Sequence, residues 1–434
     1  SQLSSAVDME ESLTPVYPAT EGVSQSRYRV LVTQALDRLA QTSIEELLPD
    51  RWDISLAQAI TYLHHPPPDT DVALLMEGKH PAQTRLAFEE LTAHQVSLRI
   101  VREQIQKLQA PVLDSPSSNY AAVKQSFGFT LTGAQQRVAD EVAVDLMKSQ
   151  PSLRLIQGDV GSGKTVIAAL ASVHSFENNF QTALMAPTEL LAEQHFINMS
   201  NWLAPLGIKP AWLSGRVTGK KRVEELARIL AGDAAVIIGT HALFQKDVEF
   251  RNLGLVIVDE QHRFGVNQRL ALRAKGSAGN TSPHQLVMTA TPIPRTLSMS
   301  IYADMDVSVI DELPPGRTPV TTTVMSDEKR DSVISRVAEA CTEGRQIYWV
   351  CTLIEESEVL QCQAAEVTEK ELAKLLPEAR IGLVHGRMAP ALKTDVMNQF
   401  KSKQLDLLVA TTVIEVGVDV PNASLMVIEN SERL

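Results

Sequence analysis

Cysteine is scarce in this 434-residue sequence: it has only Cys341, Cys351 and Cys362, and these form no Cys-x-x-Cys pair. This spacing argues against a disulfide framework or a zinc site and indicates free thiols in a reducing compartment. The sequence also lacks a run of the roughly 18 apolar residues that a membrane-spanning helix needs. A basic start followed by an apolar segment is missing too, so we expect neither a membrane span nor a secretory signal.

An excess of positive charge is absent as well. The formal net charge is −12 and the isoelectric point is about 5.4, which argues against a wholly basic nucleic-acid binder. A local basic groove on an acidic body remains compatible with these numbers. Hydrophobic residues make up 44% and charged residues 21%, as in ordinary globular proteins. At about 100–200 residues per domain, the length predicts two to four domains.

The first 128 residues carry no sheet pattern. Residues 1–24 are polar, and residues 25–128 predict a helical spacer. A capping box formed by Ser43 and Glu46 predicts one helix start. Further helices are expected at 55–63, which ends before three prolines, and at 82–108, which follows Pro81. Another helix is predicted by an apolar stripe with helical spacing at Val30, Leu31, Ala35, Leu36 and Leu39.

Beyond residue 128 short apolar runs alternate with amphipathic helices, which is typical of parallel sheets covered on both faces. A proline-rich stretch at 313–319 interrupts this pattern and predicts a stiff linker. We therefore expect an α/β fold with two tandem domains, at 129–312 and 313–434. The predicted strands are 153–156, 183–186, 235–238, 255–258, 286–288, 347–350, 381–384, 407–409 and 425–428.

The segment GDVGSGKT at 158–165 fits the P-loop pattern G-x-x-x-x-G-K-[ST], between a predicted strand and a predicted helix. Its glycines let backbone N–H groups face phosphate oxygens, and the helix N-terminus adds a positive dipole end. Lys164 is expected to hold the β- and γ-phosphates, and the Thr165 hydroxyl to bind Mg²⁺. The remaining phosphate-binding candidates are Gly158, Gly161, Ser162 and Gly163.

Two carboxylates, Asp259 and Glu260, follow the predicted strand at 255–258. The carboxyl ends of parallel strands line the ligand crevice of an open α/β sheet. Asp259 suits the Mg²⁺ shell, and Glu260 suits polarisation of the water that attacks the γ-phosphate. Together with the P-loop, these residues predict an ATP-hydrolysing enzyme.

These motifs, together with TATP at 289–292, resemble superfamily 2 helicases, whose motor consists of two RecA-like P-loop domains. Phe129 with TGAQ at 132–135 is similar to the adenine-reading block of that superfamily. The segments APTEL at 186–190 and GTHAL at 239–243 are similar to its DNA-strand blocks. The resemblance implies ATP and Mg²⁺ as cofactors.

More specific blocks narrow the resemblance to the RecG family and its relative Mfd. These are DEQHRFGV at 259–266 and TATPIPRT at 289–296. The segments ELPPGR at 312–317, 349–358 and TTVIEVGVDVP at 411–421 look like RecG alone. An Mfd-type protein is expected to have Glu in place of Gln261 and a different linker.

The resemblance implies a role for each matching residue. Gln135 and Phe129 would recognise adenine. The hydrolysis of ATP would be catalysed by Lys164, Asp259 and Glu260. His262 would couple the nucleotide site to Thr289 and Thr291. Gly417 and Asp419 would close on the nucleotide from the second domain. The DNA backbone would lie against Pro187, Thr188, Thr240, His241, Thr411 and Thr412.

The family implies ATP-driven translocation on branched DNA, with regression of stalled replication forks and branch migration of Holliday junctions in bacterial recombination and repair. It also implies a cytoplasmic monomer, and contact with single-strand-binding protein is a family-level expectation. Residues 1–24 resemble the end of an OB-fold wedge domain.

The chain starts with Ser1 and stops soon after the strand at 425–428, so we expect a fragment whose second motor domain is incomplete. We expect this fragment to bind nucleotide but to hydrolyse it poorly or not at all. An arginine block that the family places beyond that strand would be missing. The alternatives are a nucleotide-dependent DNA- or partner-binding module without unwinding, and an Mfd-type transcription-repair translocase.

Overall fold

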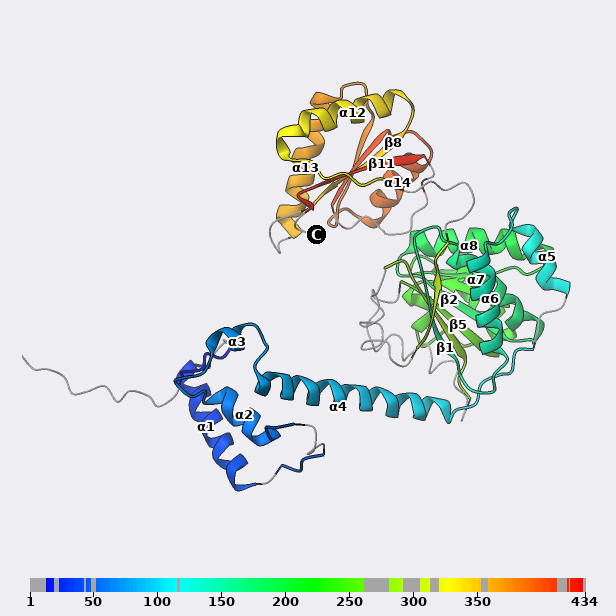
Figure 1. Ribbon diagram of the computed structural model, residues 1–434. Coiled ribbons are helices and arrows are strands. Elements are labelled where there is room, and N and C mark those ends of the chain that lie inside the picture. Colours follow the sequence, from blue (N-terminus) through cyan, green and yellow to red (C-terminus); the bar gives the residue numbers. More distant parts are fainter. Residues whose placement is uncertain are drawn as a thin grey trace, which may run out of the picture. The chain divides into compact units, whose positions relative to one another are not determined.

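The protein was analysed as a computed structural model, which describes residues 13–18, 23–42, 44–47, 52–114, 118–260, 281–291, 305–312, 320–352, 358–411, 420 and 422–431. The chain divides into two compact units, with the first boundary between Gln104 and Ile105. The first unit is helical, and the second contains both sheets (Figure 1). Within the described residues, no helix combines the length and apolarity that a bilayer span demands.

The N-terminal unit is built from helices α1 (Gln25–Gln41), α2 (Leu56–His64), α3 (Val72–Met76) and α4 (Pro81–Gln106). Polar side chains start three of them, since Ser24, Ser55 and Asp71 each accept a hydrogen bond from a backbone N–H of the first turn. Helices α2 and α4 confirm the helices predicted at 55–63 and 82–108. In α1 the predicted stripe is helical, but Val30 is 57% exposed and Leu31 is 53% exposed.

The capping box predicted at Ser43 and Glu46 is wrong, because the described residues 44–47 are not helical. The Glu46 carboxylate accepts a hydrogen bond from the Leu56 backbone N–H, and its Oε2 lies 2.8 Å from Arg85 Nη2. Arg85 is fully buried and also pairs with Glu89. A buried guanidinium needs such partners, so Glu46 serves this tertiary pair rather than a local cap.

The larger unit begins with two helices, α5 (Ser118–Ser126) and α6 (Gly133–Leu146), which precede the first sheet. Seven parallel strands form that sheet, in the order β3-β4-β2-β5-β6-β1-β7. The strands are β1 (Leu153–Gly158), β2 (Gln181–Met185), β3 (Ala211–Leu213), β4 (Val236–Gly239), β5 (Leu253–Asp259), β6 (His284–Thr289) and β7 (Asp306–Ile310). The intervening helices are α7 (Lys164–Glu177), α8 (Glu189–Leu203) and α9 (Gly219–Ala231), with short 3-10 helices at Ala204–Leu206 and His241–Phe244.

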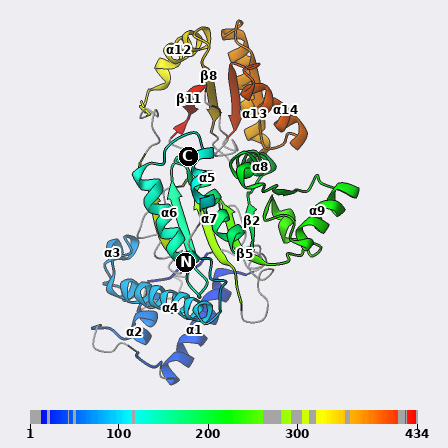
Figure 2. The same cartoon turned by 90° about the vertical axis from the view of Figure 1, so that its right-hand side faces the viewer.

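Both faces of this sheet are buried, as the continuous apolar runs predict. Alternate residues along β5 point to opposite faces, so Leu255 and Ile257 lie in one apolar cluster while Val256 and Val258 lie in another. The first cluster also holds residues of α5, α6, α7 and α8, and the second holds Ile229 of α9. Figures 1 and 2 show α6 and α7 beside each other against this sheet.

The second sheet has four parallel strands in the order β11-β8-β10-β9. The strands are β8 (Gln346–Cys351), β9 (Ile381–Val384), β10 (Leu407–Thr411) and β11 (Ala423–Glu429). Helices α12 (Arg330–Thr342) and α13 (Glu358–Leu375) share an apolar cluster with Trp349 and Val409. Helix α14 (Pro390–Lys401) packs Phe400 on the other face, against Tyr348. The predicted α/β class with two tandem domains is therefore confirmed.

Candidate nucleotide site and DNA-contacting residues

The predicted P-loop joins β1 to α7 at the carboxyl edge of the first sheet. Gly161 has a φ of 77° and Gly163 has a φ of 95°, a left-handed backbone that glycine adopts without steric cost. Gly163 is also the N-cap of α7 and has no side chain that could satisfy the first N–H groups of the helix. The positive dipole end of the helix therefore faces the loop without a side-chain cap.

Gln135 connects the predicted adenine-reading block to the P-loop. Its side chain and that of Thr132 form a reciprocal capping box at the start of α6. Its amide Nε2 donates a hydrogen bond of 2.8 Å to the Ser162 carbonyl oxygen. A Cβ atom built on Gly163 would lie only 2.3 Å from that Nε2, so the close approach of Gln135 requires glycine at this position.

Two polar side chains of the loop suit a bound phosphate. Lys164 Nζ donates hydrogen bonds to the carbonyl oxygens of Gly158 at 2.6 Å and Asp159 at 3.0 Å, which holds the ammonium over the loop. The Ser162 hydroxyl is buried and has no hydrogen-bond partner among the described residues. A buried hydroxyl without a partner calls for one. These residues therefore fit the triphosphate of a nucleotide.

Asp259 ends β5, and its side chain is held from α8. The carboxylate oxygen Oδ2 lies 2.7 Å from His195 Nε2, and both residues are buried. Strand β6 lies between β5 and the P-loop strand β1, with all three parallel. Asp259 and the P-loop consequently lie at the same edge of the sheet. The side chains of Asp259 and Thr165 carry oxygen atoms, the ligand type that Mg²⁺ prefers.

Glu260 has an uncommon backbone conformation and a fixed carboxylate. Its φ is 49°, in the left-handed region that non-glycine residues rarely adopt. Its carboxylate accepts hydrogen bonds from the Thr289 hydroxyl at 3.3 Å and from the Ala290 backbone N–H at 3.1 Å. Thr289 in turn accepts from the Thr291 backbone N–H at 3.2 Å. The segment after β6 thus holds the predicted catalytic carboxylate.

Five of the six residues predicted to line the DNA backbone lie at or just after the carboxyl ends of strands β2, β4 and β10. Thr188 caps α8 by accepting a hydrogen bond from the Leu191 N–H, and Pro187 precedes it after β2. Thr240 follows β4; its hydroxyl is buried and finds no partner among the described residues, whereas His241 is exposed. In the second domain Thr411 is the buried last residue of β10.

Phe129 is 46% exposed beside Phe127, with the two rings stacked at a centroid distance of 5.7 Å. An aromatic face of this kind suits stacking on a base. Four predicted site residues, His262, Thr412, Gly417 and Asp419, lie outside the described residues.

Sequence reasoning missed three contacts of the site. It gave no role to His195, to the Ala290 backbone N–H or to Glu312. The Glu312 carboxylate accepts a hydrogen bond of 3.0 Å from the Ala134 N–H at the start of α6. The sequence signal available for Glu312 was its place at the start of the ELPPGR segment at 312–317, just before the predicted linker.

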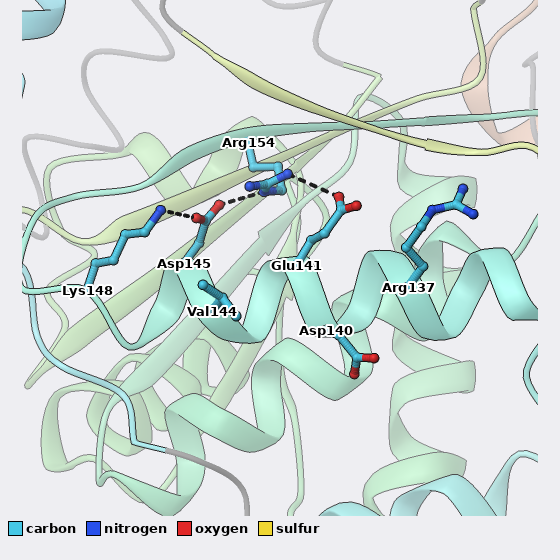
Figure 3. A pocket seen from close by; sticks show the side chains of 7 residues that line it. All are labelled: Arg137, Asp140, Glu141, Val144, Asp145, Lys148 and Arg154. Atoms are coloured by element: carbon cyan, nitrogen blue, oxygen red, sulfur yellow. Dashed lines mark hydrogen bonds and ion pairs between the residues drawn. The ribbon is translucent and has the colours of Figure 1, made fainter.

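A groove farther along α6 does not belong to this site. Figure 3 shows how its charges pair: Lys148 and Arg154 both bind Asp145, and Arg154 also binds Glu141. Burial alone would raise the pKa of Asp145, but the hydrogen bonds from Arg154 and Lys148 lower it. With its charges matched internally, the groove offers no evident ligand site. It is lined by Arg137, Asp140, Glu141, Val144, Asp145, Lys148 and Arg154.

Two family models match the chain. Residues 132–300 match the DEAD/DEAH box helicase family, and residues 328–433 match the helicase conserved C-terminal domain. The first matched range contains strands β1 to β6 of the first sheet, and the second range contains all four strands of the second sheet. Both ranges lie within the two predicted motor domains at 129–312 and 313–434.

Named relatives are similar over nearly the whole chain. The chain is 57% identical to the ATP-dependent DNA helicase RecG of Pasteurella multocida, over 98% of this chain and 62% of the relative. It is 56% identical to RecG of Escherichia coli strain K12, over 99% of this chain and 63% of the relative. The chain thus spans somewhat less than two thirds of these relatives.

Solved structures agree with the sequence comparison. The structure of RecG bound to a three-way DNA junction is 36% identical, with a TM-score of 0.73, and the match covers 97% of this chain and 55% of that one. The helicase MrfA bound to DNA shares the fold at 17% identity and a TM-score of 0.54, over 74% of this chain and 48% of that one.

Proposed function

The chain belongs to the RecG family of DNA helicases, and we propose from this premise that it is the motor of an ATP-driven translocase. The observation that carries the proposal is the edge of the first sheet. There the P-loop follows β1, and the Asp259 and Glu260 carboxylates stand at the end of β5, with β6 between these two strands. This is the set of groups that phosphoryl transfer to water requires.

The residues divide the chemistry among them. The P-loop N–H groups, Ser162 and Lys164 bind the phosphates, while Phe129 and Gln135 hold the base. A bound Mg²⁺, held by Thr165 and Asp259, would neutralise charge on the β- and γ-phosphates. Glu260 accepts the proton of the attacking water, and its hydrogen bonds to the backbone and side chain after β6 keep its carboxylate aimed.

The same hydrogen bonds link hydrolysis to the segment after β6. When Glu260 changes its partners during turnover, Thr289 and Ala290 lose or regain a hydrogen bond. We propose that His262 and Thr291 take part in this coupling. Closure of Gly417 and Asp419 of the second domain on ATP, and opening after hydrolysis, would then alternate the grip on DNA.

We propose branched DNA as the substrate, with fork regression and Holliday-junction branch migration in bacterial recombination and repair as the cellular reactions. The solved relative named above is bound to a three-way junction. In this chain Pro187, Thr188, Thr240 and His241 would contact the backbone of one strand, joined by Thr411 and Thr412. Hydroxyl groups and helix N-termini bind phosphates without a large positive charge, which agrees with a net charge of −12.

Some finer points stand as proposals of the same kind. The protein would act as a monomer in the bacterial cytoplasm and would contact single-strand-binding protein. A polypeptide of residues 1–434 alone would bind ATP but hydrolyse it slowly, because its sequence has no arginine-rich block after β11. An arginine that reaches the γ-phosphate contributes about 10³–10⁵ in rate.

The test measures nucleotide binding and ATP turnover by the 434-residue chain, with forked DNA, with linear duplex and without DNA. We expect nucleotide binding that Lys164→Ala abolishes and turnover near background. Turnover that forked DNA stimulates and that Lys164→Ala removes would support the motor but refute the impairment. If the wild-type chain binds no nucleotide, or if Lys164→Ala leaves binding unchanged, the proposed function is wrong.

A further inference from the structure

The His195–Asp259 pair links a helix of the first domain to the carboxylate proposed for Mg²⁺. His195 is 6% exposed and Asp259 is 7% exposed, and Nε2 lies 2.7 Å from Oδ2. An ionised carboxylate only accepts hydrogen bonds, so the ring nitrogen Nε2 donates. The pair therefore has a fixed direction, from the imidazole of α8 to the last residue of β5.

Within the described part of the chain, the hydrogen bond between His195 and Asp259 is the main polar contact that orients their side chains. The other ring nitrogen of His195, Nδ1, is buried and has no hydrogen-bond partner there. Among the described residues, the hydrogen bond to Asp259 is therefore the one polar contact that orients the His195 ring. On Asp259 the described residues engage only Oδ2, which leaves Oδ1 for another partner.

The geometry explains what the histidine adds. Pairing of β5 with β6 places the Asp259 backbone opposite Met288, but it leaves the side-chain torsions open. Rotation of a carboxylate about its last bond has only broad minima, so strand pairing alone does not aim its oxygens. The hydrogen bond from Nε2 selects one orientation. Carboxylates that bind metals are commonly fixed in this way by an outer partner.

We propose that His195 is a positioning residue that holds the Asp259 carboxylate in the orientation that binds Mg²⁺. This inference rests on the proposed function, because it assumes that Asp259 binds the metal of a nucleotide complex. It assigns His195 no contact with the nucleotide. His195 lies on α8 about two turns after Thr188, which caps the start of that helix.

The experiment measures the affinity of the chain for a ribose-labelled fluorescent ADP, with Mg²⁺ and with Mg²⁺ removed by a chelator. Two substitutions of similar volume are compared: His195→Gln keeps a side-chain N–H donor, and His195→Met does not. Lys164→Ala tests whether the signal comes from the P-loop. Met199→Ala removes a fully buried side chain from the same helix and controls for loosening of α8.

We expect Mg²⁺ to tighten ADP binding in the wild type, in His195→Gln and in Met199→Ala. In His195→Met this Mg²⁺-dependent gain should fall by about 10–100-fold, the usual effect of losing an outer partner of a metal ligand. Affinity without Mg²⁺ should be unchanged. Equal Mg²⁺ responses in the Gln and Met variants, whether kept or lost, would overturn the inference.

Folding is checked by a thermal melt of each variant. If His195→Met does not fold, His195→Gln still decides, because a folded Gln variant that loses the Mg²⁺ response contradicts the role of the donor. A wild-type chain that shows no binding sensitive to Lys164→Ala would instead refute the proposed function. The two failures are therefore distinguishable.

Discussion

Gly163→Ala is the substitution whose cost follows most directly from the structure. Two separate effects act at this position. The φ of 95° lies in the left-handed region, and the new Cβ would lie 2.3 Å from Gln135 Nε2 and 3.1 Å from its Cδ. The backbone effect costs about 1–2 kcal/mol. The clash, which forces the Gln135 amide off Ser162, adds about 1–3 kcal/mol.

Gly207→Ala is the matched control. Its φ of 69° is also left-handed, but nothing lies within 4 Å of the added Cβ. Only the backbone effect of about 1–2 kcal/mol should remain. For a domain of roughly 150–250 residues, each kcal/mol lowers the melting temperature by about 2–4 °C. Gly163→Ala should therefore lower it by about 10 °C, and Gly207→Ala by about 4 °C.

The assay is differential scanning calorimetry of the single variants and of Gly163→Ala in a Gln135→Ala background. Because alanine at 135 removes the atoms that the new Cβ meets, the added cost of Gly163→Ala should fall to about 1–2 kcal/mol in that background. Equal shifts for Gly163→Ala and Gly207→Ala would refute the reasoning. An unchanged cost of Gly163→Ala when Gln135 is absent would refute it equally.

Three further substitutions test the site and its support. Glu260→Gln should keep nucleotide affinity and reduce any measurable ATP turnover by about 10²–10⁴-fold, because an amide cannot accept the water proton. Unchanged single-turnover hydrolysis would contradict the role of Glu260 as the general base. Glu312→Ala removes the acceptor of the Ala134 N–H and should lower the free energy of unfolding by about 0.5–2 kcal/mol. A thermal melt measures this loss, and amide exchange in the first turn of α6 should become faster. The pKa of Asp145 lies below its usual range in the folded chain. The contribution of this carboxylate to the free energy of unfolding is therefore fully present above the unfolded pKa of about 3.9, and it is lost as the pH falls through the lower folded pKa. Asp145→Asn should thus cost about 3 kcal/mol near pH 7, because it replaces the buried carboxylate that pairs with Arg154 by a neutral amide. The cost should fall progressively below about pH 4 in urea melts, and a cost that does not change with pH would speak against the assignment.

The sequence predicted the strands of both sheets well where they are continuously apolar. The strand expected at 255–258 is β5, and that at 407–409 is β10. Two strands were missed. β3 has only three residues and lies at one edge, and β7 alternates apolar and polar residues at the other edge. Edge strands bury less surface, so the apolar run that marks an inner strand is weaker there.

The candidate site was predictable where one local segment carries the chemistry, and unpredictable where distant segments meet. The P-loop at 158–165 and the carboxylates after β5 are such local segments. The role of Glu46 depended on Arg85, 39 positions away, and the local capping rule therefore failed. His195 was missed for the same reason, because its partner Asp259 is 64 positions away.

Strand pairing also bears on the coupling that we propose for the end of β6. In the sheet β6 lies between β1 and β5, with Gln157 opposite Thr289 and Asp259 opposite Met288. The end of β6 therefore borders both the phosphate loop and the carboxylates. Glu260, in its left-handed conformation, turns its carboxylate onto Thr289 and Ala290 rather than away from them. The left-handed backbone of Glu260 costs about 1–3 kcal/mol, which these two hydrogen bonds help to offset. The proposed coupling therefore needs only a change of hydrogen-bond partner at Thr289 and Ala290, which lie at the strand end next to the phosphate loop.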